Sequence, residues 1–363
     1  MSTLNISKWD LHKHKVKSAT KISIVIVAVL ASMLQINFQG EKTIMQVFHA
    51  GSLTGPFSKY ATFWTLMNPD QIIDNEGYGS AIAIRQVTEL GRRADLVGSA
   101  DYSLIETMMM EKRIPGTNIN FSSWYVIFAR NRMVLAYDPR NNPPFLHNLI
   151  NHVNNWWEIL TLPEVTFGRA DPWQDPCGYR TLMVWALADR YYNLTKDENP
   201  QLINISMFRK DPIMGYSGPG ATLVKAKEID LVASLKSGEI DYLFIYESIA
   251  IQHKLAYFEF DDHCDLSNFS LEEFYNKVKV CRASPLVPGE GSPPKKAKTI
   301  QYGLTIPNIA AHPVEAIIYL QFILMNPQFI ESMGLKPYSP IYASDTTKIP
   351  ASLRALCTDY PLA

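Results

Sequence analysis

Apolar and polar positions follow two different periods along the chain, and segments of the two kinds alternate. The stretch TIMQVFHA at 43–50 is rich in branched and aromatic residues, which is typical of a strand. The next segment, 56–67, has apolar side chains at Phe57, Tyr60 and Trp64. That spacing places them on one side of a helix.

The same alternation continues to the end of the chain. Strands are predicted at 43–50, 71–74, 94–101, 124–137, 164–170, 241–248 and 300–307, and helices at 56–67, 81–90, 181–192, 229–238 and 313–325. Strands that alternate with helices indicate an α/β protein with a parallel, doubly wound sheet. The segment GEGSPPKKAK at 289–298 is the clearest loop by composition.

The first forty residues have a different pattern. Five lysines between Lys8 and Lys21 precede the apolar run ISIVIVAVLASMLQI at 22–36. This order is typical of a secretory signal peptide or an uncleaved N-terminal anchor. The run is shorter than the roughly 20 residues that span a bilayer comfortably. We therefore interpret 1–40 as a signal peptide or membrane anchor and expect the rest of the chain to lie outside the cytoplasm.

Composition narrows the class of protein. The 363 residues, 47% of them hydrophobic and 19% charged, suffice for about two domains with ordinary cores. A formal net charge of -1 without a long basic run in the body gives no indication of a nucleic-acid partner. Four widely spaced cysteines without a CxxC pair argue against a zinc or iron–sulfur site. Cys264 and Cys281 could pair if the protein works outside the cytoplasm, which the sequence leaves open.

Three predicted strands are followed by a small or polar turn and a helix start. These turns are HAGS at 49–52, GYGS at 77–80 and DPCGY at 175–179. Ligands of open α/β sheets bind at the carboxyl ends of strands, where serine hydroxyls and free main-chain N–H groups bind anions. Each turn alone is also an ordinary helix cap. Three of them behind an export signal favour an extracytoplasmic anion receptor.

An enzyme is the rival class. The chain has no GxxxxGK[ST] phosphate loop, no GxGxxG followed by an acid on a later strand, and no GxSxG elbow. Cys177 at a helix start would have a lowered pKa and would be a candidate nucleophile, but no histidine base lies near it in sequence. We therefore expect no enzymatic activity and no cofactor.

Six segments between about residues 45 and 340 carry a resemblance to a known family. They are FHAGSLTGPF, EGYGSAIAIRQVTELGRRADLVGSADY, WYVIFARNRMVLAY, DPCGYR, KEIDLVASLKSGEIDYLFIYESIAIQH and YGLTIP. In this order they resemble the archaeal-type tungstate/molybdate-binding proteins, which are substrate-binding components of ABC transporters. The combination of DPCGYR with FIYESIAIQH is the most specific part.

The resemblance implies a fold and a division of the chain. The family has the two-lobed periplasmic-binding-protein fold of type II, in which each lobe is a mostly parallel sheet flanked by helices and the ligand lies in the cleft. By this analogy the first lobe comprises 43–129 and 302–363, and the second comprises 130–301. The two crossings between the lobes, within WYVIFARNRM and near IQYGLTIP, would form the hinge.

The resemblance also implies a set of ligand-binding residues: Gly51, Ser52, Ser80, Asp175, Pro176, Cys177, Glu228 and Tyr246. Asp175 and Glu228 would be direct ligands to the Mo or W atom, so that the tetrahedral oxyanion expands towards six-coordination. Main-chain N–H groups behind Pro176 would hold oxygens, and proline suits this first helical position because it has no N–H to leave unpaired.

The two acids discriminate between candidate ligands. A carboxylate beside a dianion is repelled by about 4 kcal/mol per pair of unit charges at ~4 Å and an effective dielectric near 20. Molybdenum(VI) and tungsten(VI) accept further oxygen ligands, whereas the centres of sulfate and phosphate do not. Two acids would therefore reject sulfate through uncompensated repulsion. The alternatives are that Glu228 is only a solvated acid in a first helical turn, or that the receptor takes sulfate or phosphate.

The expected partners follow from this interpretation. We expect a monomer that closes around tungstate or molybdate and then docks on the membrane permease of an ABC transporter. The sequence leaves open which of the two oxyanions is preferred, because both are dianions of nearly equal size and chemistry.

Overall fold

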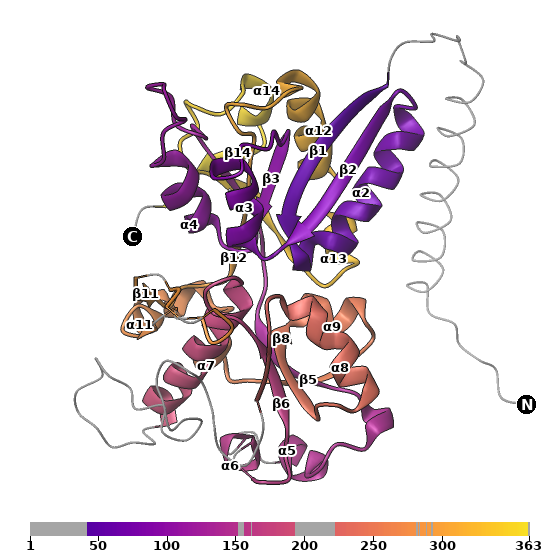
Figure 1. The fold of residues 1–363 in the computed structure, drawn as a ribbon, viewed down its shortest axis with the longest axis vertical. Helices are drawn as coiled ribbons and strands as arrows, with labels where there is room; N and C mark the ends of the chain where they lie inside the picture. The colour runs from indigo at the N-terminus through magenta and orange to yellow at the C-terminus, as the bar shows by residue number, and fades with distance from the viewer. Residues whose placement is uncertain are drawn as a thin grey trace, which may run out of the picture.

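The computed structural model describes residues 42–151, 156–160, 162–192, 222–280, 282, 284–287, 289–291 and 293–361. These residues form two bodies, each built on one β-sheet with helices against it, and the bodies lie one above the other in Figure 1. We call the body around the seven-stranded sheet the first lobe and the body around the five-stranded sheet the second lobe.

The first lobe contains the start and the end of the described chain. Its strand order is β14-β13-β4-β12-β3-β1-β2. The bounds are β1 (Thr43–Ala50), β2 (Gln71–Tyr78), β3 (Leu96–Ser99), β4 (Val126–Arg130), β12 (Gln301–Thr305), β13 (Lys336–Ala343) and β14 (Cys357–Asp359). The helical segments are η1 (Gly51–Leu53), α2 (Thr54–Met67), α3 (Ser80–Thr88), α4 (Tyr102–Ile105), η2 (Glu106–Met110), α12 (Pro313–Met325), α13 (Gln328–Glu331) and α14 (Ala351–Arg354).

Alternation along β1 explains why this sheet has helices on both faces. Val47 belongs to the apolar cluster that contains Phe57 and Trp64 of α2, whereas Phe48 belongs to the cluster that contains Ile84 of α3. Successive side chains of a strand point to opposite faces, so one strand contributes to both layers of the core. The predicted helical face of 56–67 is confirmed by this packing.

The second lobe is built around an aromatic core. Its strand order is β7-β6-β8-β5-β9, with β5 (Met133–Tyr137), β6 (Phe167–Ala170), β7 (Thr222–Lys225), β8 (Tyr242–Tyr246) and β9 (Ala256–Glu259). The other elements are η3 (Pro139–Asn141), α5 (Leu146–Asn151), α6 (Trp156–Leu160), α7 (Pro176–Tyr192), η7 (Glu228–Asp230), α8 (Leu231–Ser237), α9 (Glu247–Gln252), α10 (Asp262–Asp265), η8 (Phe269–Leu271), α11 (Glu272–Tyr275), β10 (Lys279–Val280) and β11 (Lys295–Lys296).

Helix α7 is the central helix of this lobe. Every residue from Pro176 to Asp189 is buried, so the helix is covered on all sides rather than on one face. The ring of Trp185 packs edge-on against Phe244 of β8, with 5.5 Å between the ring centroids. The middle of α7 is therefore packed against β8 of the sheet.

The sheets need a correction to the expectation that each is mostly parallel. In the first sheet β1 runs parallel to β2 and β3, and β13 to β14, but β12 is antiparallel to β3 and β4, and β13 is antiparallel to β4. In the second sheet β6 is parallel to β7 and β8, whereas β5 is antiparallel to β8 and β9. Strands β4, β5 and β12, which flank the crossings between the lobes, make most of the antiparallel pairs.

The predicted strand 124–137 is divided between the lobes. Strand β4 ends at Arg130 in the first sheet, and β5 begins at Met133 in the second, so the chain changes lobes at residues 131 and 132. The two halves are alike in sequence because both are buried strands, which explains why the apolar pattern alone indicates one long strand. The lobe boundaries 43–129, 302–363 and 130–301 stay predictions at the level of single residues.

Two predictions fall on residues that the structure does not describe. Within the described ranges, no helix is both long and apolar enough to cross a membrane. The predicted signal peptide or anchor at 1–40 lies outside those ranges. Cys281, whose pairing with Cys264 the sequence leaves open, also lies outside them.

Gly178 in the first turn of α7 provides a test of the packing. A Cβ at this position would lie 2.5 Å from the carbonyl carbon of Asp171 and 2.6 Å from the carbonyl oxygen of Ala170. Main-chain atoms cannot move aside as a flexible side chain can. We therefore expect Gly178→Ala to lower the free energy of unfolding by about 2–3 kcal/mol, measured by urea denaturation. An unchanged unfolding midpoint would contradict the contact between α7 and the end of β6.

Candidate functional site

Residues from both lobes meet between the two sheets. The first lobe contributes Gly51 and Ser52 of η1, and Ser80 at the start of α3. The second lobe contributes the start of α7 and Glu228 of η7. A Cβ built on Gly51 would lie 3.4 Å from Glu228 Oε1, so these two predicted residues face each other across the cleft.

Asp175 joins the start of α7 to η7 in the second lobe. One carboxylate oxygen accepts a hydrogen bond from the Cys177 N–H at 2.8 Å, as a helix N-cap does. The other accepts from the Glu228 N–H at 3.0 Å. Because Pro176 is the first residue of the helix, the cap satisfies the first available N–H. Asp175 thereby places the two predicted metal ligands side by side.

The same cap changes one expectation about this turn. The N–H of Cys177 was expected to hold a ligand oxygen, but in the structure it donates to Asp175. The N–H of Gly178 donates to the Asp175 carbonyl oxygen at 3.0 Å. A ligand oxygen at this helix start would have to share these donors.

Glu228 is a buried acid whose carboxylate is only partly hydrogen-bonded. Its exposed fraction is 1%, and its Oε2 atom has no hydrogen-bond partner among the described residues. Burial and then the neighbouring charge of Asp175 raise the pKa of Glu228 well above its usual value. A buried polar atom left unpaired costs about 1–3 kcal/mol. The position therefore suits a carboxylate that completes its contacts with a ligand.

Three of the predicted site residues carry hydroxyl groups. Ser80 Oγ accepts a hydrogen bond from the Ala100 N–H at 3.0 Å, and Ser52 Oγ accepts one from the Tyr302 hydroxyl at 2.9 Å. The Tyr246 hydroxyl accepts one from Arg180 Nη1 at 2.7 Å. Burial raises the pKa of Tyr246 well above its usual value, although the Arg180 cation acts in the opposite direction. The tyrosine therefore keeps its proton.

Cys177 does not have the properties of a nucleophile. Its thiol is fully buried and lies 3.8 Å from the carbonyl oxygen of Phe244. Burial, followed by the charges of Asp175 and Glu228, raises the pKa of the Cys177 thiol well above its usual value. The lowered thiol pKa that the enzyme hypothesis required is wrong, because burial and then the two neighbouring acids raise it instead.

The structure adds residues that the sequence analysis did not select. Arg180 and Tyr302 donate to the hydroxyls of Tyr246 and Ser52, and both are fully or almost fully buried. Asn131, at the crossing between the lobes, donates to Tyr302. Arg180 and Tyr302 lie inside the segments DPCGYR and YGLTIP. Each is a polar residue within an apolar run, and this pattern could have identified them as candidate site residues from the sequence.

The lobes are in contact around the cleft. A Cβ on Gly79 of the first lobe would lie 2.3 Å from the carbonyl oxygen of Gln174 in the second lobe. The guanidinium of Arg85 lies 4.3 Å from the centre of the Trp173 ring. These contacts show a closed arrangement of the two lobes.

An ion pair also joins the lobes. Asp101, after β3, forms a salt bridge with Lys295 of β11 and accepts a hydrogen bond from Tyr179 of α7. Burial favours the neutral carboxyl, but the cations of Lys295 and Arg180 outweigh it and hold the pKa of Asp101 well below its usual value. The predicted loop 289–298 thus contains a short strand, β11, that supplies a contact across the cleft.

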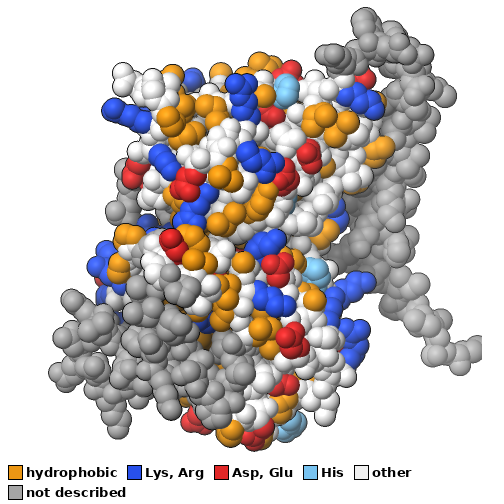
Figure 2. Space-filling model, in the orientation of Figure 1, with side chains coloured by type: hydrophobic (Ala, Val, Ile, Leu, Met, Phe, Trp, Pro, Cys, Tyr) orange, Lys and Arg blue, Asp and Glu red, His pale blue; other side chains and the backbone are white. Residues whose placement is uncertain are grey.

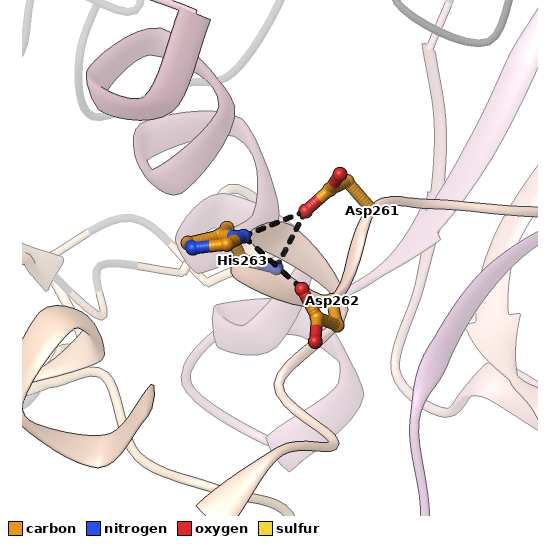
Figure 3. A group of neighbouring side chains, drawn as sticks. All are labelled: Asp261, Asp262 and His263. Carbon is orange, nitrogen blue, oxygen red and sulfur yellow. Dashed lines mark hydrogen bonds and ion pairs between the residues drawn. The ribbon is translucent and has the colours of Figure 1, made fainter. Parts of the chain in front are cut away.

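A separate group of charged residues lies at Asp261, Asp262 and His263, where the side chains could approach one metal ion (Figure 3). Asp261 Oδ1 accepts from the His263 N–H at 2.9 Å and lies 2.8 Å from the ring Nδ1. The His263 ring stacks on Tyr191 with 4.2 Å between centroids. These contacts are those of an N-cap of α10, and we assign the group to that role.

Charge over the surface is mixed. On the face shown in Figure 2, basic and acidic side chains are interspersed over both lobes, in keeping with the net charge of -1. The acids of the site are buried and do not contribute to this surface.

Comparisons with known proteins bear on the family of this chain. The profile of a family described as "Bacterial extracellular solute-binding protein" matches residues 45–329. The Molybdate/tungstate-binding protein WtpA of Thermococcus kodakarensis is 32% identical over 327 residues, which cover 84% of this chain and 87% of the relative.

Solved structures show the same fold. The periplasmic molybdate-binding protein of Azotobacter vinelandii has a TM-score of 0.50 at 14% identity and covers 80% of this chain and 98% of its own. The sulfate-binding protein SubI of Mycobacterium tuberculosis has a TM-score of 0.51 at 13% identity, and the match covers 82% of this chain and 88% of SubI. These comparisons confirm the predicted two-lobed binding-protein fold of type II.

A substitution at Gly79 can test closure of the lobes without destabilising the fold. Its backbone angles, φ -65° and ψ 142°, are accessible to alanine, and the clash lies in the other lobe. We expect Gly79→Ala to leave the urea unfolding midpoint unchanged, in contrast to Gly178→Ala. Small-angle scattering with tungstate should show a larger radius of gyration than for the unmodified protein. Equal compaction of both proteins would argue against the closed contact.

Lys295 tests the ion pair across the cleft. We expect Lys295→Gln to weaken binding of an oxyanion about tenfold, because the closed form loses a buried contact to Asp101. The exposed neighbour Lys296 provides a matched control, and Lys296→Gln should bind as the unmodified protein does. Calorimetric titration measures both variants, and equal affinities for the two would exclude a role of this ion pair in closure.

Proposed function

Because the chain belongs to the family of bacterial extracellular solute-binding proteins, we propose that it captures tungstate or molybdate outside the cytoplasm and delivers it to an ABC transporter. The likeness to the Thermococcus kodakarensis protein supports this ligand class. The segment 22–36, predicted to be part of a signal peptide or an anchor, would keep the protein close to its permease if it is retained as an anchor. We propose that the protein acts as a monomer.

The observation that carries the proposal is the pair of buried acids at the junction of the lobes. Asp175 and Glu228 are 2% and 1% exposed, and Glu228 Oε2 has no hydrogen-bond partner among the described residues. A site for an ordinary anion would place donors here, because a carboxylate repels a dianion. A carboxylate is useful where the central atom of the ligand can accept another oxygen.

The remaining groups suit the oxygens of such a ligand. Ser52, Ser80 and Tyr246 carry hydroxyls that already accept hydrogen bonds from the protein, so each has its own O–H to donate. Gly51, without a side chain, lets the first lobe approach Glu228 closely. We propose that these residues bind oxygens while Asp175 and Glu228 bind the metal atom. Pro176 and Cys177 shape the turn.

The two acids would also set the specificity. In a closed, water-poor cleft, sulfate would meet two acids whose ionised forms repel it and whose oxygens its central atom cannot bind. Tungstate and molybdate offset the same repulsion by forming bonds from the metal atom to the carboxylate oxygens. The site would therefore reject sulfate even though the hydroxyl donors would suit it.

Calorimetric titration of the full-length protein in mild detergent tests the proposal. We expect tight binding of tungstate and molybdate and no measurable heat with sulfate. Asp175→Asn and Glu228→Gln should each weaken tungstate binding by about a hundredfold or more, ~3 kcal/mol. Sulfate bound as tightly as tungstate would show that the acids are structural and that the receptor takes ordinary oxyanions.

Asp230 supplies the matched control for these variants. It is an exposed acid two residues after Glu228 in the same short helix η7. Asp230→Asn removes the same charge from the same element without touching the cleft. This variant should bind tungstate with unchanged affinity. A loss of affinity equal to that of Glu228→Gln would show that net charge near the site, and not contact of Glu228 with the ligand, controls binding.

A further inference from the structure

The three hydroxyls of the site share one pattern of hydrogen bonding. Each accepts a hydrogen bond from a donor of the protein: Ser80 from a main-chain N–H, Ser52 from Tyr302, and Tyr246 from Arg180. A hydroxyl has one hydrogen and accepts at its oxygen. When the protein occupies the accepting side, the hydrogen is left for another partner.

Tyr302 is held in its donating role by the crossing segment. Asn131 Nδ2 donates to the Tyr302 hydroxyl at 3.0 Å and to Ser248 Oγ at 2.8 Å. The orientation of this amide is determined by its oxygen, which accepts from the Arg132 N–H at 2.9 Å. Since the Tyr302 oxygen already accepts from Asn131, its hydrogen points to Ser52 Oγ, 2.9 Å away.

Arg180 plays the equivalent part for Tyr246. The guanidinium can only donate, so the Tyr246 oxygen must be the acceptor in their 2.7 Å contact. The same Nη1 atom lies 2.7 Å from the carbonyl oxygen of Ala100 in the first lobe. Arg180 is buried, with an exposed fraction of 3%, so water does not compete for these bonds.

These bonds connect two of the hydroxyls, those of Ser80 and Tyr246, across the cleft. The Ala100 N–H donates to Ser80, and the Ala100 carbonyl accepts from Arg180, which in turn donates to Tyr246. On the other side, Ser52 is linked through Tyr302 to Asn131 at the crossing between the lobes. The full set of donors is therefore assembled only when the lobes are closed.

We propose that Arg180 and Tyr302 are positioning residues that fix the hydroxyls of Tyr246 and Ser52 as hydrogen-bond donors towards the oxyanion. The inference rests on the proposed function, since it assigns a direction to hydroxyls that are taken to face the ligand. Neither residue needs to touch the ligand. Each acts by occupying the accepting side of a hydroxyl that does, so its effect depends on that hydroxyl being present.

A double-mutant cycle with tungstate tests the Tyr302 arm in the full-length protein. We expect Tyr302→Phe to weaken tungstate binding about tenfold, because Ser52 is then free to rotate its hydrogen away from the ligand. In a Ser52→Ala background the same substitution should change the affinity less than about twofold. Equal losses in the two backgrounds would show that Tyr302 acts through general packing and would overturn the proposal for it.

Tyr338→Phe is the matched control for loss of a tyrosine hydroxyl. The Tyr338 hydroxyl accepts from Gln301, the residue before Tyr302 in β12, and is not bonded to a site residue. This variant should leave tungstate affinity unchanged in both backgrounds. A tenfold loss here would assign the Tyr302 effect to disturbance of the strand and would contradict the positioning role.

The Arg180 arm uses the same design with Tyr246. We expect Arg180→Lys to weaken tungstate binding about tenfold, because the lysine side chain keeps the charge but ends one bond short of the Nη1 atom that donates to both Ala100 and Tyr246. In a Tyr246→Phe background the same substitution should change the affinity less than about twofold. Additive losses would overturn the proposal for Arg180. If Arg180→Lys fails to fold, as judged by urea denaturation, the Tyr302 cycle decides the positioning mechanism by itself.

The two levels of inference are distinguished in these experiments. Absence of tungstate binding by the unmodified protein would overturn the proposed function and this inference with it. Tight tungstate binding with additive cycles would leave the proposed function in place and overturn only the positioning role.

Discussion

The Asp175 carboxylate is the contact on which the site depends. With one oxygen it caps α7 at Cys177, and with the other it holds the main chain of Glu228. A single buried side chain thus fixes two loops that are separated by more than fifty residues. Because the central helix α7 is covered on all sides, the position of Asp175 is set by the whole aromatic core of the second lobe.

The electrostatics of the site follow from this arrangement. Two carboxylates are buried together, which costs several kcal/mol per group unless they are compensated. Asp175 obtains hydrogen bonds from the main chain, but Glu228 keeps an unpartnered oxygen and a raised pKa. The cation of Arg180 is directed to Tyr246 and Ala100. A ligand that bonds to the carboxylates would supply the missing compensation, and this couples specificity to the stability of the closed form.

Closure brings in groups that neither lobe contains alone. The Asp101–Lys295 ion pair, the contact of Gly79 with Gln174 and the link from Ala100 to Arg180 all cross the cleft. Each requires one lobe to lie in a particular position relative to the other, so the closed form is a defined arrangement of the two lobes. Each hydroxyl donor is oriented by a bond within its own lobe, and the link from Arg180 to Ala100 joins two of these bonds across the cleft, which ties ligand recognition to closure.

The sequence by itself determined the local pieces of this protein. Apolar periodicity and caps are properties of neighbouring residues, so the helix at α2 and the turn before Pro176 were predictable, as was the family from its ordered motifs. Only the tertiary structure decided how the pieces combine. Buried strands are apolar on both faces, so the run 124–137 gave no sign of where it changes sheets. The hydrogen bond from Tyr302 to Ser52 joins residues 250 positions apart in the sequence, and a pattern among neighbouring residues cannot predict such a contact.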